Sequence, residues 1–212
     1  MVDKLSELIR NANLILHEDG LASLVMSVLF RRGVFLIYWN NLDGSRYSPI
    51  VGNPILMVIN SPEEFNQLLS EGFNLLEYMK ATRLSFCSGQ TLFLAFIEKE
   101  VKCGIRVLYD RSGVYSYFCP SLVDDGHTAY IDCVWTNPDS RRFGFASFVY
   151  SAIFDYLSNK GMSRVINITN KGNVAANNCQ AKLGSYLWGE GYQIVLFLLL
   201  NIKWVKKIEG VK

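Results

Sequence analysis

Apolar and polar residues follow two different periods along this chain of 212 residues. Short apolar runs that end at Gly, Pro, Asn or Asp predict strands. Apolar residues spaced three and four apart predict helices. We expect strands at about 33–39, 54–59, 91–98, 101–110, 113–118, 128–136, 164–169 and 192–200. We expect helices at about 3–16, 21–31, 73–83, 142–160 and 173–183, with a further helix that begins at Pro62.

Mixed strands and helices, with a hairpin before a strand-helix-strand-helix unit, predict an α/β fold with a mixed sheet. Residues 40–49, NNLDGSRYSP, are rich in turn formers and favour a boundary near residue 50. We therefore expect an N-terminal extension of helix and strand over 1–50 and a main domain over 51–212.

Three local patterns make sharper predictions. The run from Ser61 to Glu64, SPEE, has a capping residue, a proline at the first helical position and a glutamate three residues after the cap. It predicts a helix start. A tight charged turn is expected at Lys99-Glu100, between two strands. The apolar run 194–200 predicts one strand that is buried on both faces.

Residues 21–39 are apolar on both sides of Arg31-Arg32. The uninterrupted runs are shorter than the roughly 20 residues of a membrane-spanning helix, and two arginines would lie near the bilayer centre. We expect a helix followed by a buried strand, and no transmembrane span. The alternative is a peripheral contact with the membrane surface, with both arginines at the lipid headgroups.

Composition disfavours several classes of function. The net charge is +2 and there is no polybasic run, so nucleic acid is not an expected partner. The five cysteines form no CxxC pair and there are only two histidines, so we expect reduced thiols and no metal site. The N-terminus carries acidic residues where a signal peptide needs a basic lead, which favours a cytoplasmic location.

The segment 138–146, PDSRRFGFA, places a proline, two arginines and small residues between a strand and a helix. The first turn of a helix leaves backbone N–H groups unpaired at its positive end. Gly144 and Ala146 would let an anion approach this backbone, and Arg141 and Arg142 add positive charge. The composition is typical of a phosphate site at a helix N-terminus. The alternative is a helix start that carries two surface arginines, and neither GxGxxG nor GxxxxGK[ST] is present.

Two motifs resemble those of the GNAT (GCN5-related) N-acetyltransferases. The RxxGxA of residues 141–146, three residues after Pro138, is similar to the family's [RQ]-x-x-G-x-[GA] pyrophosphate loop, which V-x-P commonly precedes. Residues 173–184 resemble the family's N-x-x-A-x-x-x-Y-x-K-x-G helix. The chain departs from these patterns at Thr136, where V-x-P has valine, and at Gln180, where the family often has the tyrosine that protonates the departing thiolate.

The resemblance implies a mixed, mostly antiparallel central sheet flanked by helices, with acetyl-CoA as co-substrate and no metal. It implies that the pyrophosphate lies on the turn and that the pantetheine arm pairs with the preceding strand. A side-chain amide at position 173 would bind the pantetheine amide. The cofactor-binding residues expected from it are Val134, Trp135, Thr136, Arg141, Arg142, Phe143, Gly144, Phe145, Ala146, Asn173 and Ala176.

An amine acceptor must lose a proton before it attacks, and the sequence offers two candidate bases. Asp132 shares a strand face with Val134 and Thr136 if no bulge intervenes, and a carboxylate that faces a sheet interior is costly without a role. His127 has a suitable intrinsic pKa. The alternatives are an ordinary edge carboxylate and a solvated loop histidine. Gln180 could donate a hydrogen bond to the departing sulfur.

The leading prediction is an N-acetyltransferase that moves an acetyl group from acetyl-CoA to an amine of a small molecule. The arginine-bearing extension and the T-x-P run are similar to GNAT proteins associated with bacterial cell-surface polysaccharide synthesis, which implies an amino-sugar acceptor. Two alternatives stay open. One is a CoA-binding or regulatory module with little catalysis, and the other is an interaction protein whose N-terminal region docks a partner or a membrane. An oligomer is compatible with each.

Overall fold

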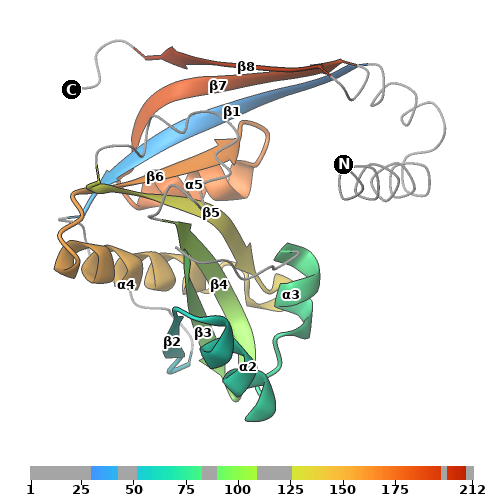
Figure 1. Ribbon diagram of the computed structural model, residues 1–212, viewed down its shortest axis with the longest axis vertical. Helices are drawn as coiled ribbons and strands as arrows, with labels where there is room; N and C mark the ends of the chain where they lie inside the picture. The colour runs from blue at the N-terminus through green and yellow to red at the C-terminus, as the bar shows by residue number, and fades with distance from the viewer. Residues whose placement is uncertain (1–29, 43–51, 83–89, 109–125, 197–199, 209–212) are drawn as a thin grey trace.

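The computed structural model describes residues 30–42, 52–82, 90–108, 126–196 and 200–208. Across these ranges eight strands form one sheet in the order β2-β3-β4-β5-β6-β1-β7-β8 (Figure 1). Neighbouring strands are antiparallel except β5 and β6, which are parallel. The strands are β1 (Phe30–Asn41), β2 (Ile55–Ile59), β3 (Gln90–Ile97), β4 (Glu100–Leu108), β5 (Thr128–Thr136), β6 (Arg164–Asn170), β7 (Tyr186–Leu196) and β8 (Leu200–Lys207). The predicted fold class, a mixed and mostly antiparallel sheet flanked by helices, is confirmed.

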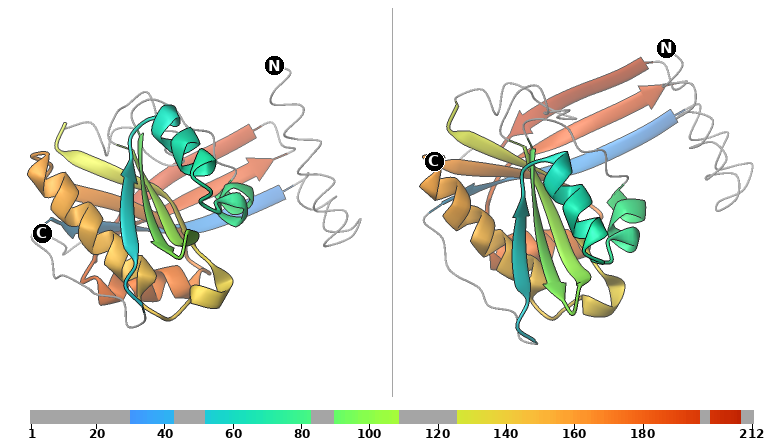
Figure 2. Two further views of the ribbon diagram at one scale, coloured as in Figure 1. Left: turned by 90° about the horizontal axis from the view of Figure 1, so that it is seen from below. Right: turned by 60° about the horizontal axis from the view of Figure 1, so that its bottom comes forward.

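Four α-helices within the described ranges cover the two faces of this sheet (Figure 2). They are α2 (Pro62–Ser70), α3 (Leu76–Thr82), α4 (Phe145–Asn159) and α5 (Val174–Lys182), with a short 3-10 helix, η2 (Pro138–Ser140), before α4. Strand β3 shows the two faces best, since Leu92 and Leu94 pack against α2 and α3 while Phe93 packs against α4. Both faces are apolar because this part of the sheet is covered on both sides.

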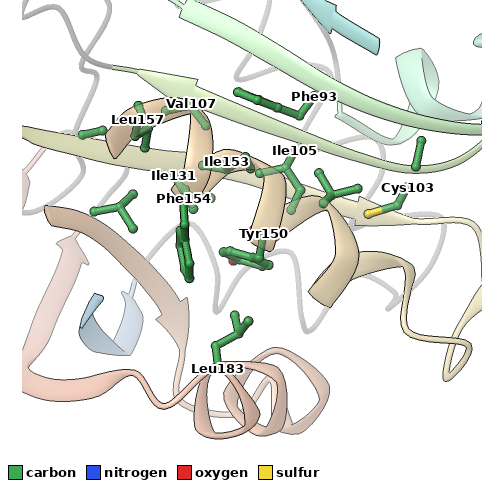
Figure 3. Close-up of a cluster of buried hydrophobic side chains, with 14 of the residues drawn as sticks. Phe93, Cys103, Ile105, Val107, Ile131, Tyr150, Ile153, Phe154, Leu157 and Leu183 are labelled. Atoms are coloured by element: carbon green, nitrogen blue, oxygen red, sulfur yellow. The ribbon is translucent and has the colours of Figure 1, made fainter. Parts of the chain in front are cut away.

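The apolar core between α4 and the sheet (Figure 3) is larger than the core on the face of α2 and α3. Helix α4 buries Val149, Ile153 and Leu157 at 0% exposure, and their spacing of four places them on one helix face. They meet alternate residues of β4 and β5, among them Ile105 and Ile131. This packing fixes α4 firmly against the strands that precede it.

Two predicted turns can be checked against the backbone. Ser61 caps α2 by accepting a hydrogen bond from the Glu64 N–H at 3.2 Å, as the sequence predicted. The turn between β3 and β4 lies at Glu98-Lys99, one residue earlier than expected. Both residues have positive φ, as a two-residue type I′ hairpin turn requires.

Strand β1 comes from the predicted N-terminal extension and lies inside the sheet. It pairs antiparallel with β6 along one edge and with β7 along the other. β1, β7 and β8 run together at one side of the sheet (Figure 1). The extension thus contributes a strand to the sheet that holds β5 and β6, while the proposed boundary near residue 50 lies in the range 43–51, outside the described residues.

The prediction of one strand over 192–200 is wrong. The structure has two antiparallel strands there, β7 and β8, paired from Gly189↔Lys207 to Leu196↔Leu200. The apolar run 194–200 contains no Gly, Pro, Asn or Asp, so no local signal predicts two strands in place of one. The predicted helices at 3–16 and 21–31 and the predicted strand at 113–118 lie outside the described residues, apart from the last two residues of the 21–31 helix, which belong to β1.

Candidate active site

Strands β5 and β6 pair over only four residues and then separate. The parallel register runs from Thr128↔Arg164 to Ile131↔Asn167. Beyond this point β5 continues beside β4, and β6 continues beside β1. The edge of β5 from residue 132 to 136 therefore faces a gap in the sheet, where an extended ligand could pair with its backbone.

A β-bulge in β5 marks the place where the strands separate. Arg106 is opposite Cys133 and Val107 is opposite Ile131, so Asp132 is the extra residue of β5. A bulge bends a strand and changes which way the following side chains point. The prediction that Asp132 shares a strand face with Val134 and Thr136 required a strand without a bulge, so it is wrong.

The Asp132 carboxylate forms an ion pair with Arg106 of β4. Arg106 lies between Ile105 and Val107, which pack against α4, so its side chain is on the opposite face. Both partners are largely buried, at 18% and 14% side-chain exposure for Arg106 and Asp132. Asp132 is thus on the face of α2 and α3 and is already neutralised by a guanidinium group, which argues against its role as a free general base.

The arginine turn is built differently from the expected simple helix start. η2 begins at Pro138, Arg142 has φ +71°, and α4 begins at Phe145 and not near Arg142. Gly144 is the N-cap with φ +84°, and no side chain caps the helix. The N–H groups of the first turn are consequently left for a ligand, beside two exposed arginines. The Arg141 side chain contacts the end of β5, where its Nε donates a hydrogen bond to the Thr136 carbonyl at 3.5 Å.

A cleft of about 1180 Å³ joins the separated strands to this turn and to α5. Twelve of the fourteen residues that the sequence predicted as site residues line it. They are Asp132, Val134, Trp135, Thr136, Arg141, Arg142, Gly144, Phe145, Ala146, Asn173, Ala176 and Gln180. The lining combines an exposed strand edge, an uncapped helix N-terminus and two cations, which suits a long ligand with an extended arm and an anionic group.

Two predicted site residues do not line the cleft. His127 precedes β5, and its carbonyl accepts hydrogen bonds from the N–H groups of Ser163 and Arg164 at 2.8 and 3.3 Å. It lies five residues before Asp132, about 16 Å along an extended strand, and so lies away from the bulge. Phe143 is 41% exposed and is not part of the cleft lining.

Asn173 caps α5, which limits what its side chain can do for a ligand. Its Oδ1 accepts from the Ala176 N–H at 3.1 Å. The Nδ2 group is the part of the amide that remains for a ligand carbonyl. Ala176, on the cleft side of the same turn, is half-buried.

Gln180 belongs to a buried polar network that sequence reasoning did not find. It is 1% exposed, donates from Nε2 to the Tyr150 hydroxyl at 2.9 Å, and accepts from the Ser185 hydroxyl at 2.8 Å. Asn40 Nδ2 and Asn167 Nδ2 donate to Gln180 and to Tyr150, respectively. The only sequence signal was a polar residue at inward positions of apolar strands, as in the run RVINIT that contains Asn167.

The face of α2 and α3 beside the bulge carries a buried tyrosine. Tyr78 is 0% exposed, and its ring makes an edge contact with Trp135, with centroids 5.7 Å apart. A Cβ atom at Gly104 would lie 2.4 Å from its ring, so glycine at this position makes room for Tyr78. Burial raises the pKa of the Tyr78 hydroxyl well above its ordinary value, so this group stays protonated.

Within the described ranges, no three His, Cys, Asp or Glu side chains are grouped so as to hold a metal ion. No helix of the described part of the chain is long and apolar enough to cross a bilayer.

The acetyltransferase (GNAT) family model matches residues 63–184, more than half of the chain. The chain belongs to the GNAT family. Acetyltransferases of this family use acetyl-CoA. The matched range includes both strands that separate, the arginine turn and α5.

Several solved structures are similar to this chain. A functionally unknown conserved protein from Staphylococcus epidermidis ATCC 12228 has 14% identity and a TM-score of 0.49, with 81% of this chain and 65% of that chain covered. A protein from Novosphingobium aromaticivorans DSM 12444, described as belonging to the GNAT family, has 15% identity and a TM-score of 0.47, with 76% and 63% covered. Aminoglycoside N-acetyltransferase AAC(6')-Iy in complex with CoA has 16% identity and a TM-score of 0.41, with 61% and 90% covered.

The chain thus spans less than two thirds of the first two of these proteins. No curated protein matches the sequence.

Proposed function

We propose that this GNAT protein is an N-acetyltransferase that moves an acetyl group from acetyl-CoA to an amine of a small molecule. The observation that carries the proposal is the continuity of one cleft from the open edge of β5 to the uncapped N-terminus of α4. Acetyl-CoA supplies an activated acetyl group as a thioester at the end of an extended arm. The strand edge suits the amides of that arm, and the helix N-terminus suits its pyrophosphate.

The residues would divide these tasks by their chemistry. The N–H groups at the start of α4, with Arg141 and Arg142 beside them, would hold the pyrophosphate. The backbone of residues 134–136 would pair with the arm, and Asn173 Nδ2 would donate to one of its carbonyl groups. Asp132 would hold Arg106 and the bulge in place and would not take the proton of the amine.

An amino sugar is our proposed acceptor class, on the resemblance to polysaccharide-associated GNAT proteins. The bulge places Asp132 and Trp135, from the face of α2 and α3, on the lining of the cleft. An acceptor could therefore reach the open end of the strands from that face while the arm enters beside α4 and α5. The ring of Trp135 is a suitable platform for the apolar face of a sugar.

Thermal unfolding with acetyl-CoA, CoA and ATP tests the co-substrate. A ligand at about 100 times its dissociation constant stabilises the folded protein by about 2.7 kcal/mol, which raises the Tm visibly. We expect a rise with acetyl-CoA and CoA and none with ATP. No rise with any of them at millimolar concentration would refute the proposal.

A second experiment tests the reaction. Release of the free CoA thiol is followed with a panel of aminoglycosides, hexosamines and simple primary amines. Release that depends on an amine supports an N-acetyltransferase, and the panel reports the acceptor class. A Tm rise without release from any amine would favour a CoA-binding module, which the ion pair of Asp132 and the burial of Gln180 make the second candidate.

A further inference from the structure

We propose that Tyr150 of α4 is a hydrogen-bond donor to the CoA sulfur, in the role left vacant by the tyrosine that Gln180 replaces. The inference rests on the proposed function, because it requires CoA in the cleft. Tyr150 is on α4, whereas the position of the family's tyrosine, Gln180, is on α5.

The hydroxyl of Tyr150 lies where the strands begin to separate. It accepts a hydrogen bond from Asn167 Nδ2, and Asn167 is the last residue of β6 that pairs with β5. Its partner across that pair is Ile131, directly before the bulge at Asp132. Tyr150, Asn167 and Ile131 all line the cleft. In Figure 3 the Tyr150 ring projects from α4 toward α5.

The hydrogen bonds of this hydroxyl leave its own proton available. A phenol oxygen accepts two hydrogen bonds and donates one. Asn167 Nδ2 and Gln180 Nε2 supply the two that it accepts. None of the described residues accepts from it. A buried O–H group without an acceptor is costly, and an acceptor supplied by a ligand removes that cost.

Gln180 is engaged in this network through both ends of its side-chain amide. Its amide donates to Tyr150, and its carbonyl oxygen accepts from Asn40 and Ser185. Gln180 therefore acts as a positioning residue that directs the Tyr150 hydroxyl. In this arrangement the hydroxyl group near the sulfur comes from Tyr150 on α4 and not from a tyrosine on α5. Gln180, which replaces that tyrosine, orients the Tyr150 hydroxyl.

The sulfur accepts a hydrogen bond here and does not take the proton. Burial raises the pKa of the Tyr150 hydroxyl well above its ordinary value, whereas a simple thiol has a pKa of about 8.5. When the amine nitrogen bonds to the acetyl carbon, the C–S bond breaks and sulfur keeps its electron pair as a thiolate. The neutral Tyr150 O–H stabilises that negative charge, and the amine gives its surplus proton to water.

Binding of CoA and of desulfo-CoA, which lacks the sulfur, tests this role without any acceptor. At a pH above the thiol pKa, Tyr150→Phe is expected to weaken CoA binding by about tenfold, as for a hydrogen bond to a charged group. Desulfo-CoA should bind both proteins within about twofold. The pKa of the bound CoA thiol, followed by thiolate absorbance, should rise in the variant by about one unit.

Tyr156→Phe is the matched control, since Tyr156 is on the same helix and its hydroxyl bonds to Asn60 at 3.1 Å, away from the cleft. It should leave both affinities and the thiol pKa unchanged. Equal weakening of CoA and desulfo-CoA by Tyr150→Phe would show a structural role only and would overturn the inference. So would no change in either ligand.

Failure of the wild-type protein to bind CoA would instead refute the proposed function itself. If Tyr150→Phe does not fold, fluorotyrosine at position 150 keeps the hydroxyl and both accepted bonds while making it a stronger donor. The pKa of the bound thiol should then fall below its value in the wild-type protein. An unchanged or higher pKa would overturn the inference.

Discussion

Two helices cover the same face of the sheet, and they are held to it by different forces. Helix α4 buries seven residues, most of them apolar, in the core over β3, β4 and β5. Helix α5 buries only Gln180 and meets β1 and β6 through hydrogen bonds, among them those of Asn177 with Tyr38 and Thr169. Apolar packing fixes a scaffold, whereas a polar network fixes the direction of particular donors and acceptors.

This difference between α4 and α5 indicates which helix orients the hydrogen-bonding groups of the cleft. Helix α4 carries the proposed anion site at its N-terminus and is held to the sheet mainly by apolar packing. Helix α5 forms the other wall and contributes hydrogen-bonding groups whose partners lie in the sheet and on α4. We expect changes under α4 to act on stability and changes under α5 to act on binding geometry.

The largest effect is expected from Ile153→Ala, which opens a cavity in the core beneath α4. Ile153 is 0% exposed, and truncations of this kind cost about 2–5 kcal/mol. Urea unfolding of the variant should show a lower midpoint with an unchanged slope. Ser158→Ala, an exposed position near the end of the same helix, should change the free energy of unfolding by less than about 0.5 kcal/mol. Equal effects of the two would contradict the account of α4.

Gln180→Leu breaks the network under α5 and should cost less than Ile153→Ala. It removes the carbonyl oxygen that accepts from Asn40 and Ser185 and the amide that donates to Tyr150, at about 1–3 kcal/mol. Affinity for CoA should fall further than this loss of stability explains, because Tyr150 loses its positioning partner. The exposed change Ala181→Leu on the same helix is the control for both measurements. A loss of stability with full affinity would show that the network does not serve the cleft.

Thiol labelling compares the accessibility of the core under α4 with that of α5 in the wild-type protein. Burial raises the pKa of Cys103, in the core under α4, to about 12, and raises the pKa of Cys179, on α5, to a smaller extent. Since the thiolate is the reactive form, a thiol reagent at pH 8 should modify Cys179 before Cys103. Mass mapping of the labelled peptides identifies the order, and urea-unfolded protein should show no preference. Early labelling of Cys103 would mean that the α4 core opens readily.

The smallest effect is expected at the surface ion pair of Lys171 and Glu190, whose charged atoms lie 2.8 Å apart. Hydrogen bonds from Lys171 and Tyr192 lower the pKa of Glu190. A lowered pKa stabilises the folded state above the unfolded pKa, and this contribution is lost as the pH falls through the folded pKa. The free energy of unfolding should therefore differ slightly less between pH 7 and pH 3 in Glu190→Gln than in the wild-type protein. At pH 7 the substitution should change it little. A large loss at pH 7 would contradict this.

The two regions also differ in how well the sequence predicts them. The strand from Thr128 to Thr136 and the capped start of α2 follow from local patterns, and both are confirmed. The arginine turn was expected to open α4 near Arg142, and positive φ at Arg142 and Gly144 delays the helix to Phe145. Short-range chemistry decides the strand and the capped helix start, so a sequence window contains what is needed to predict these two.

The network under α5 could not be predicted because its members come from distant parts of the chain. The hydrogen bond between Asn40 and Gln180 joins residues 140 positions apart. The bulge that moves Asp132 to the other face and the place of β1 between β6 and β7 depend on strand pairing. Pairing is decided by the whole sheet, and a local hydrophobic pattern does not reveal it.

Calorimetric titration of acetyl-CoA into a pair of glycine variants tests the cleft most directly. Gly144→Glu and Gly161→Glu place the same charge at positions with φ +84° and +76°, at opposite ends of α4. Backbone strain is therefore comparable, and only Gly144 lines the cleft. We predict one binding site in the wild-type protein and in Gly161→Glu, and no measurable binding in a folded Gly144→Glu. Full affinity in Gly144→Glu would contradict the claim that acetyl-CoA rests on the start of α4.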